Sequence, residues 1–235
     1  MVTDLQDFSF TALLRIWGIG LTHANIVLLL LSLVCTASFC WAIMAHFRRE
    51  TNMARGMQIV SSLSLLFFAI HLRALWQGTI APFYVGASGV FYVGSFFLFW
   101  WAVRTTRRSR LTLAYSNDTP EFITLHGPYR WIRHPFYTAY LLFWFAGVLA
   151  TRSPLMLTAF FTLGTLYVFA ARKEEAKFLA SPLADEYRFL QQTTGMFLPR
   201  LGSFSGAALT STNSSAATPA SPKDNKLPAS TSARS

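Results

Sequence analysis

Five long apolar runs dominate this chain and leave few folds open to it. Each is long enough, or nearly so, to cross a hydrocarbon layer about 30 Å thick. The runs lie at Asn25–Ala45, Met57–Trp76, Pro82–Val103, Pro135–Thr151 and Pro154–Ala171. Only 13% of the residues are charged and 53% are hydrophobic, whereas soluble domains carry about a quarter charged residues. The sequence therefore predicts an all-α integral membrane protein, a helical bundle of about five transmembrane helices.

The distribution of positive charge predicts how these helices cross the membrane. The formal net charge is +10, and basic residues gather in His46–Arg55, in Val103–Arg133 and after Ala171. With five spans, these three regions fall on one side of the membrane and the loops with few charges on the other. The positive-inside rule then predicts a cytosolic C-terminus. Because this topology accounts for the charge, we expect membrane lipids and no nucleic acid as partners.

Composition divides the chain into three parts. In residues 1–24, Arg15 interrupts an apolar stretch, which predicts an N-terminal interfacial segment rather than a span. Residues 25–201 form the predicted membrane domain. Residues 202–235 are mostly Ser, Ala, Thr and Pro, with too few large apolar residues to offset the entropy cost of ordering. They predict a disordered tail.

Polar residues crowd the start of the fourth apolar run. The stretch from Glu121 to Tyr137 reads EFITLHGPYRWIRHPFY, in which Gly127-Pro128 predicts a turn. Pro135 suits the first turn of a helix, so His134 is presented at a helix start beside free backbone N–H groups. Such residues can simply anchor a span in the head groups. Polar groups near lipid are costly, however, and usually have a function.

A second polar cluster, Arg172-Lys173-Glu174-Glu175, follows the fifth run. The fourth and fifth runs are joined by a very short loop and must form a tight antiparallel hairpin. The two polar clusters can therefore meet at one face of the membrane. This places the predicted catalytic region within residues 121–201, at the cytosolic end. The alternative is that both glutamates only pair with Lys177 or Arg172 on a solvated helix surface.

The stretches GPYRWIRHPFY and RKEEAKFLASPLADEY resemble the isoprenylcysteine carboxyl methyltransferase family and the related phospholipid N-methyltransferases. The resemblance covers about Glu121–Leu201. It implies a cytosol-facing pocket for S-adenosylmethionine, a strand-like segment at Glu121–Thr124 and a location in the endoplasmic reticulum. The cofactor-binding residues that it implies are Glu121, Phe122, Ile123, Thr124, Tyr129, His134, Pro135, Phe136, Tyr137, Glu174 and Glu175.

The sequence departs from the family in two places. The family often has an arginine four residues before the acidic residue, to hold the substrate, and this chain has Ala171 there with Arg172 one step on. The family's Phe-Gly pair before Tyr187 is Leu183-Ala184 here. Arg172 is the expected catalytic residue, orienting an anionic acceptor. A role as a helix-end anchor explains it nearly as well.

The residue types suit this cofactor. A glutamate can bind its ammonium, and His134 or helix-start N–H groups can bind its carboxylate. Faces of Tyr129, Tyr137 or Trp131 can favour the sulfonium by cation–π attraction. The chain has no GxGxxG motif after a strand and no Cys/His spacing typical of a metal site. We therefore expect neither a Rossmann nucleotide site nor a metal.

The favoured acceptor is the carboxylate of a prenylated cysteine that enters from the bilayer. An ionised carboxylate needs no general base, whereas an amine must first lose a proton. A phospholipid amine or a small thiol is the alternative acceptor. The alternative from another class is a non-catalytic membrane transporter or ligand-binding protein that uses the same polar cluster.

Overall fold

The structure is a computed structural model that describes residues 22–45, 55–78, 80–107 and 122–200. All of the predicted tail (202–235) and most of the predicted interfacial segment (1–24) lie outside these residues. The elements are α2 (His23–Ala45), α3 (Arg55–Gln77), α4 (Pro82–Thr106), the 3-10 turn η1 (Gly127–Arg130), α5 (Pro135–Thr151), α6 (Pro154–Leu179) and α7 (Ala184–Thr193).

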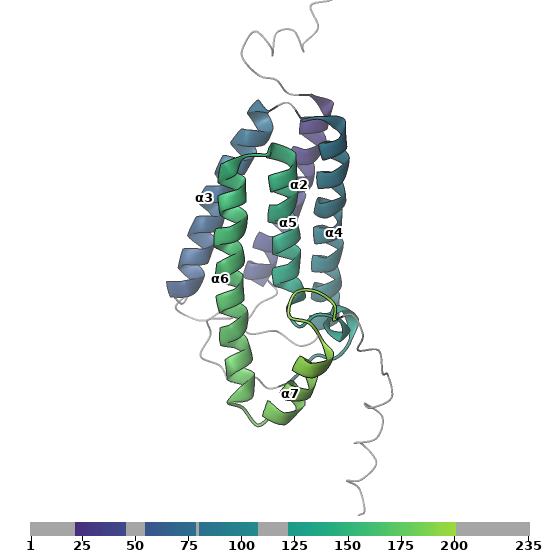
Figure 1. Cartoon of the computed structure of the whole chain (residues 1–235), viewed down its shortest axis with the longest axis vertical. Helices are drawn as coiled ribbons and strands as arrows, with labels where there is room; N and C mark the ends of the chain where they lie inside the picture. Colours follow the sequence, from purple (N-terminus) through teal and green to yellow (C-terminus); the bar gives the residue numbers. More distant parts are fainter. Residues whose placement is uncertain (1–21, 46–54, 79, 108–121, 201–235) are drawn as a thin grey trace, which may run out of the picture. The chain divides into compact units, whose positions relative to one another are not determined.

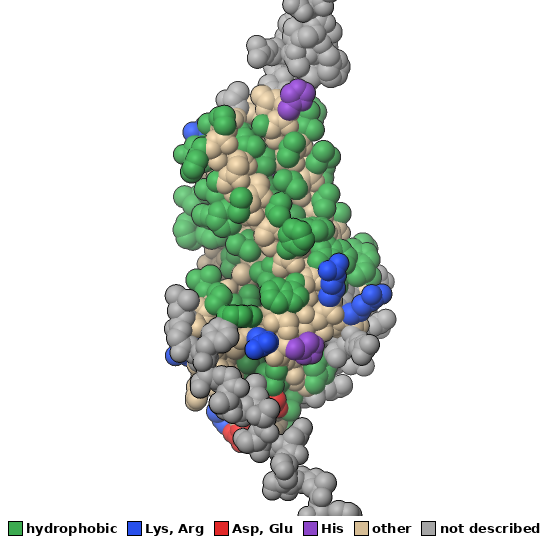
Figure 2. Space-filling model, turned by 90° about the vertical axis from the view of Figure 1, so that its right-hand side faces the viewer, with side chains coloured by type: hydrophobic (Ala, Val, Ile, Leu, Met, Phe, Trp, Pro, Cys, Tyr) green, Lys and Arg blue, Asp and Glu red, His purple; other side chains and the backbone are tan. Residues whose placement is uncertain are grey.

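The helices confirm the prediction of an all-α membrane bundle. The four helices α2, α3, α4 and α6 are long and apolar enough to cross a membrane, and α5 is a shorter apolar helix of 17 residues. Figure 1 shows α2 to α6 side by side along one direction. On the face in Figure 2, hydrophobic side chains cover the upper part, and arginine or lysine side chains gather mainly toward the lower end.

Prolines begin three of the helices, as the sequence predicts for α5. Pro82, Pro135 and Pro154 occupy the first turns of α4, α5 and α6, where a missing N–H leaves no hydrogen bond unmade. The loop between α5 and α6 is short because Arg152 takes a left-handed conformation and donates its N–H to the Val148 carbonyl. The predicted tight hairpin is therefore present.

The core is formed by aromatic and small side chains between the helices. Helix α5 packs most extensively against α4 and then α6, while α3 packs against α6. The ring centroids of Phe99 and Phe136 lie 5.5 Å apart across the α4–α5 contact. On the same contact, Ser95 Oγ donates to the Ala139 carbonyl at 2.7 Å. A satisfied polar contact of this kind stabilises helix pairs in lipid.

Helix α6 is longer than a membrane requires, and its end carries α7. Its 26 residues span roughly 39 Å, and the apolar stretch ends at Ala171. Helix α7 folds back on this extension, where the Phe178 and Tyr187 rings stack with centroids 4.5 Å apart. Figure 1 shows the extension and α7 at the end where α5 begins. The two polar clusters of the sequence thus lie at the same end of the bundle.

The strand-like segment implied by the resemblance is not a strand. Residues 122–125 have no regular secondary structure, and Glu121 lies outside the described residues. Within the described part of the chain, the one isolated β-bridge joins Ile132 to Gly195. The segment therefore has no partner strand to complete a ladder, although residues 122–124 line the cavity described below.

Candidate active site

His134 lies at the N-terminus of α5 and is hydrogen-bonded to the segment that follows α7. It is the N-cap of α5, and its N–H donates to the Met196 carbonyl at 3.1 Å. The Arg133 N–H donates to the Gly195 carbonyl at 2.8 Å, and Thr138 Oγ1 donates to the Phe197 carbonyl at 3.0 Å. We call residues 194–197 the strap. These bonds satisfy groups at the helix start that have no partner within the helix.

Both ring nitrogens of His134 face a carboxylate. Nδ1 lies 3.3 Å from Oε2 of Glu174, and Nε2 lies 3.2 Å from Oε1 of Glu175. The glutamates come from the extension of α6, so the α5–α6 hairpin brings together the two polar clusters that are 40 residues apart in the sequence. A histidine between two carboxylates is held in one ring orientation.

Glu175 is the more deeply enclosed of the two carboxylates. Its Oε1 accepts from Arg133 Nε at 2.8 Å, and its Oε2 accepts from Gln191 Nε2 at 2.9 Å. Arg133 also donates through Nη1 to the Thr194 carbonyl of the strap. Only 9% of the Glu175 side chain and 9% of the Arg133 side chain are exposed. This ion pair therefore joins α6, α7 and the strap to the residue before His134.

The Glu174 side chain is more exposed and lines a cavity. Its Oε1 accepts a hydrogen bond from the Tyr137 hydroxyl at 2.8 Å, and its side chain is 25% exposed. Successive residues of a helix point about 100° apart, so the two neighbouring glutamates face different surroundings. Glu174 lines the cavity described next, and Glu175 lies behind it.

The two carboxylates also set the charge of His134. Burial alone lowers the pKa of this imidazole, but hydrogen bonds and charge attraction from Glu174 and Glu175 outweigh the effect of burial. The pKa of His134 is therefore raised above its ordinary value of 6.5. By contrast, burial raises the pKa of the Tyr129 and Tyr187 phenols, which keeps both hydroxyls protonated.

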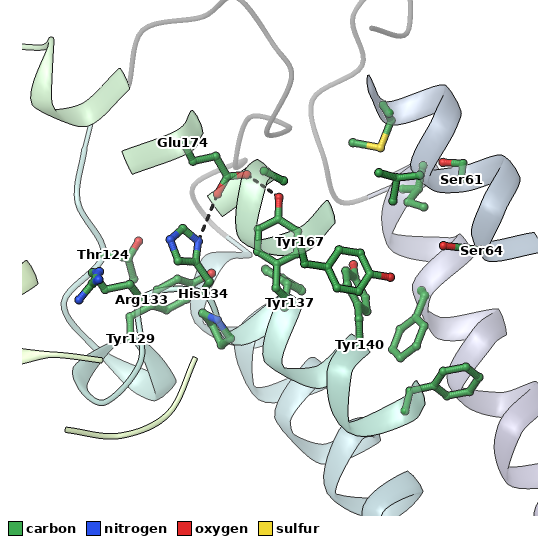
Figure 3. Close-up of a pocket in the computed structure, with 18 of the residues that line it drawn as sticks. Ser61, Ser64, Thr124, Tyr129, Arg133, His134, Tyr137, Tyr140, Tyr167 and Glu174 are labelled. Carbon is green, nitrogen blue, oxygen red and sulfur yellow. Dashed lines mark hydrogen bonds and ion pairs between the residues drawn. The ribbon is translucent and has the colours of Figure 1, made fainter. Parts of the chain in front are cut away.

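A cavity of about 520 Å³ opens beside this cluster. Its polar end is lined by the cluster and by residues 122–124. The rest is an apolar arm that runs between the helices and is lined by α2 and α3 as well as α5 and α6. In Figure 3, Glu174 and His134 lie at one side of the cavity and α3 lies at the other.

Three tyrosines separate the polar end from the arm. The Tyr137 and Tyr167 rings stack with centroids 5.5 Å apart, and Tyr140 lies 5.6 Å from Tyr167. Trp144 Nε1 donates to the Tyr167 hydroxyl at 3.3 Å. Figure 3 shows these rings between Glu174 and α3. Aromatic faces in such a position attract cations and exclude water.

The structure brings most of the sequence-predicted site residues to the cavity. Those that line it are Phe122, Ile123, Thr124, Tyr129, His134, Pro135, Phe136, Tyr137 and Glu174. Glu175 contacts His134 from behind the lining, and Glu121 lies outside the described residues. Arg172 is exposed on α6 and does not belong to the lining, so its expected role in holding an acceptor stays a prediction.

Several lining residues were not among the predicted site residues. Arg133 lines the cavity, as do Tyr140, Tyr167 and Lys177. Tyr167 precedes Glu174 by seven residues, which is two helical turns, and Tyr140 follows Tyr137 by three. This sequence spacing could have predicted that both tyrosines lie on the same helix faces as the site residues. In the described residues, no group of three His, Cys, Asp or Glu side chains is arranged to hold a metal ion.

The family model for phospholipid methyltransferases matches residues 83–186, from the start of α4 to the first turn of α7. The match includes η1, His134, both glutamates and the hairpin between them. No curated protein and no solved structure matches the chain. Over residues 83–186 the chain is similar to phospholipid methyltransferases, and this likeness supports a membrane methyltransferase.

Proposed function

We propose that this protein transfers a methyl group from S-adenosylmethionine to an acceptor carried on a lipid. One observation carries the proposal: a single cavity joins a carboxylate–histidine cluster to an apolar arm between transmembrane helices. A soluble acceptor would have no use for that arm. A lipid can reach it from the bilayer with its reactive group at the polar end.

The polar end suits the charges of this cofactor. The Glu174 carboxylate would hold the ammonium, and the ring of Tyr137 would lie against the sulfonium. Backbone groups of residues 122–124 would contact the rest. When bound, the cofactor supplies an electrophilic methyl group, and transfer of that methyl needs alignment and exclusion of water rather than a protein nucleophile.

The groups around Glu174 keep its carboxylate in place. Tyr137 donates to one of its oxygens, and His134 faces the other. His134 is itself held by Glu175, whose charge is balanced by Arg133. Arg133, His134 and Glu175 therefore act as positioning groups, and Glu174 is the group that meets the cofactor.

A phospholipid amine is the acceptor that these surroundings favour. The tyrosine rings at the neck of the arm suit an ammonium group, which is attracted to aromatic faces. The family match points the same way. Arg172, the residue expected to hold an anionic acceptor, is exposed and outside the lining.

The carboxylate of a prenylated cysteine is the second candidate. It is favoured by the cationic groups Arg133, His134 and Lys177, which line the same cavity. A carboxylate also needs no deprotonation, whereas an amine must lose its proton before the methyl transfer. The two acceptors are distinguished by supplying labelled cofactor with a phosphatidylethanolamine or with a farnesyl-cysteine analogue.

Orientation and location are part of the proposal. Basic residues at the end that carries the cluster favour a cytosolic site and C-terminus, and the family resemblance favours the endoplasmic reticulum. Protease accessibility of a C-terminal tag in sealed microsomes tests the orientation. Cleavage only after the membranes are opened would contradict it.

Cofactor binding is the first test. Purified protein in detergent should bind S-adenosylhomocysteine, as measured by calorimetry. Substitutions His134→Ala and Glu175→Ala should abolish binding, while Glu186→Gln on the exposed face of α7 should leave it unchanged. If the wild-type protein does not bind, or if both alanine variants bind normally, a non-catalytic transporter or ligand-binding protein becomes the better explanation.

A further inference from the structure

The apolar arm of the cavity contains hydroxyl groups, although a hydrocarbon chain bound there would have no group to form hydrogen bonds with them. Thr36 on α2 and Ser61 and Ser64 on α3 line the arm among Phe, Leu, Met and Val side chains. Figure 3 shows Ser61 and Ser64 directed from α3 toward the tyrosines. Ser61 and Ser64 are three residues apart, which places them on one helix face.

Thr36 has a buried hydroxyl oxygen without a hydrogen-bond partner among the described residues. Other hydroxyls in this bundle bond to a carbonyl one turn back in their own helix. Ser38 donates to the Val34 carbonyl at 2.8 Å, and Thr106 donates to the Ala102 carbonyl at 2.9 Å. A buried hydroxyl without a partner destabilises a protein, so an acceptor atom of a ligand in the arm would stabilise the Thr36 side chain by pairing with it.

Ser64 and Ser61 have different positions beside the tyrosines. The Ser64 and Tyr167 side chains both line the arm, close to its neck (Figure 3). Ser61 lies one turn closer to the start of α3. Together with Thr36 on α2, it can present hydroxyl donors from two of the helices that line the arm.

The three hydroxyls lie roughly 9 to 14 Å along their helices from the end of α2 and the start of α3. Thr36 is about two and a half turns before the end of α2, and Ser61 and Ser64 are about two turns after the start of α3. Tyr167, which lines the same cavity, is two turns or roughly 10 Å from Glu174 along α6. This separation matches the extent of an ethanolamine phosphate head group and its glycerol backbone. The ester oxygens of a phospholipid would therefore reach the hydroxyls when its amine reaches the polar end.

We infer that Thr36 and Ser61 form an ester-recognition element that selects lipids with acyl ester groups. The inference rests on the proposed function and names the lipid class that the arm accepts. Ester carbonyl oxygens accept hydrogen bonds from the two hydroxyls. An isoprenoid chain has no acceptor at this depth and would leave the Thr36 hydroxyl unpaired.

The test compares two lipids that differ only in the ester. Wild-type protein in nanodiscs is given labelled cofactor with a diester phosphatidylethanolamine or with its diether analogue of the same chains. We expect a preference of about twenty-five-fold for the diester, the contribution of two hydrogen bonds of about five-fold each. In Thr36→Val, which keeps the shape and removes one hydroxyl, the preference should fall by about five-fold. Thr158→Val on the exposed part of α6 is the matched control, because Thr158 bonds to its own helix.

A second measurement, the lipid that stays bound during purification, tests this inference independently of the proposed methyl transfer. Native mass spectrometry measures the ratio of diester to diether lipid that co-purifies with each variant, whether or not methyl transfer occurs. A ratio that falls by about five-fold in Thr36→Val, but not in Thr158→Val, supports the ester-recognition element. Equal ratios in wild-type and Thr36→Val protein overturn it. Absence of transfer to every lipid, with the retention ratio intact, contradicts the methyltransferase proposal instead.

Discussion

Among the described residues two histidines are buried, and their surroundings differ in almost every respect. His134 lies at the end of α5 with a carboxylate at each ring nitrogen. His71 lies within α3, where Nε2 is 2.8 Å from the Tyr92 hydroxyl and Nδ1 has no hydrogen-bond partner among the described residues. Its other neighbours are aromatic rings such as Phe143. Only the first histidine belongs to a charged network and opens onto the cavity.

The comparison teaches that burial does not by itself identify a functional histidine. His71 packs tightly against α5, since a Cβ added to Gly147 would lie 3.1 Å from its Nδ1. It joins α3, α4 and α5 through one hydrogen bond and close packing. His134 instead has groups of opposite charge from a distant part of the chain. The following predictions test this difference between a charged site and a structural contact.

The largest effect is expected from breaking the buried ion pair. Arg133→Gln leaves the buried charge of Glu175 without its main partner, which should lower the free energy of unfolding by about 3 kcal/mol. Arg172→Gln, at an exposed arginine of the same end, should change it by less than about 0.5 kcal/mol. Unfolding experiments in detergent measure the free energy of unfolding of both variants. Equal effects would mean that the ion pair does not hold the site together.

The next largest effect concerns cofactor binding. Glu174→Gln removes the charge proposed to meet the cofactor ammonium and should weaken S-adenosylhomocysteine binding by roughly thirty-fold, or about 2 kcal/mol. His71→Asn should leave this affinity within about two-fold, because His71 does not line the cavity. Calorimetric titration checks both. A loss of affinity in His71→Asn as large as that in Glu174→Gln would contradict the distinction between the two histidines.

A smaller effect is expected from pH. The pKa of His134 is raised in the folded protein, so the protonated imidazole stabilises the fold. This contribution is fully present below the ordinary pKa of 6.5 and is lost as pH rises through the raised value. The difference in Tm between the wild type and His134→Asn should therefore shrink from pH 6 to pH 9. The exposed His126→Asn provides the control, and a difference that is constant with pH would contradict the prediction.

The smallest effect is expected at the partner of His71. Tyr92→Phe removes one hydrogen bond between α3 and α4 and should lower the free energy of unfolding by about 1 kcal/mol. Cofactor affinity should not change. A large loss of affinity with little loss of stability would show that His71 and Tyr92 act on the site from a distance.

The starts of the helices were predictable because local chemistry sets them. Pro135 and Pro154 begin α5 and α6 as predicted, and the short loop between them makes an antiparallel hairpin. The hairpin in turn brings His134 to Glu174 and Glu175, as the sequence predicts. The prediction of a strand-like segment was wrong for residues 122–124, because an extended stretch forms a strand only beside a partner strand.

The roles of neighbouring charged residues could not be predicted. Glu174 and Glu175 are adjacent and chemically alike, so the sequence cannot say which one lines the cavity. Arg133 and Arg172 are both arginines beside the same cluster, yet the first is buried in an ion pair and the second is exposed. These differences depend on the rotation of α6 and on the position of α7 and the strap.

The sequence by itself determined a membrane bundle, its helix starts and the meeting of two polar clusters. These properties follow from local hydrophobicity, from proline and from one short loop. Tertiary structure decided which carboxylate faces the cavity and that α2 and α3 supply its apolar arm. The physical reason is that the rotation of each helix is set by packing against helices distant in the sequence, and a change of one residue in phase turns a side chain by about 100°.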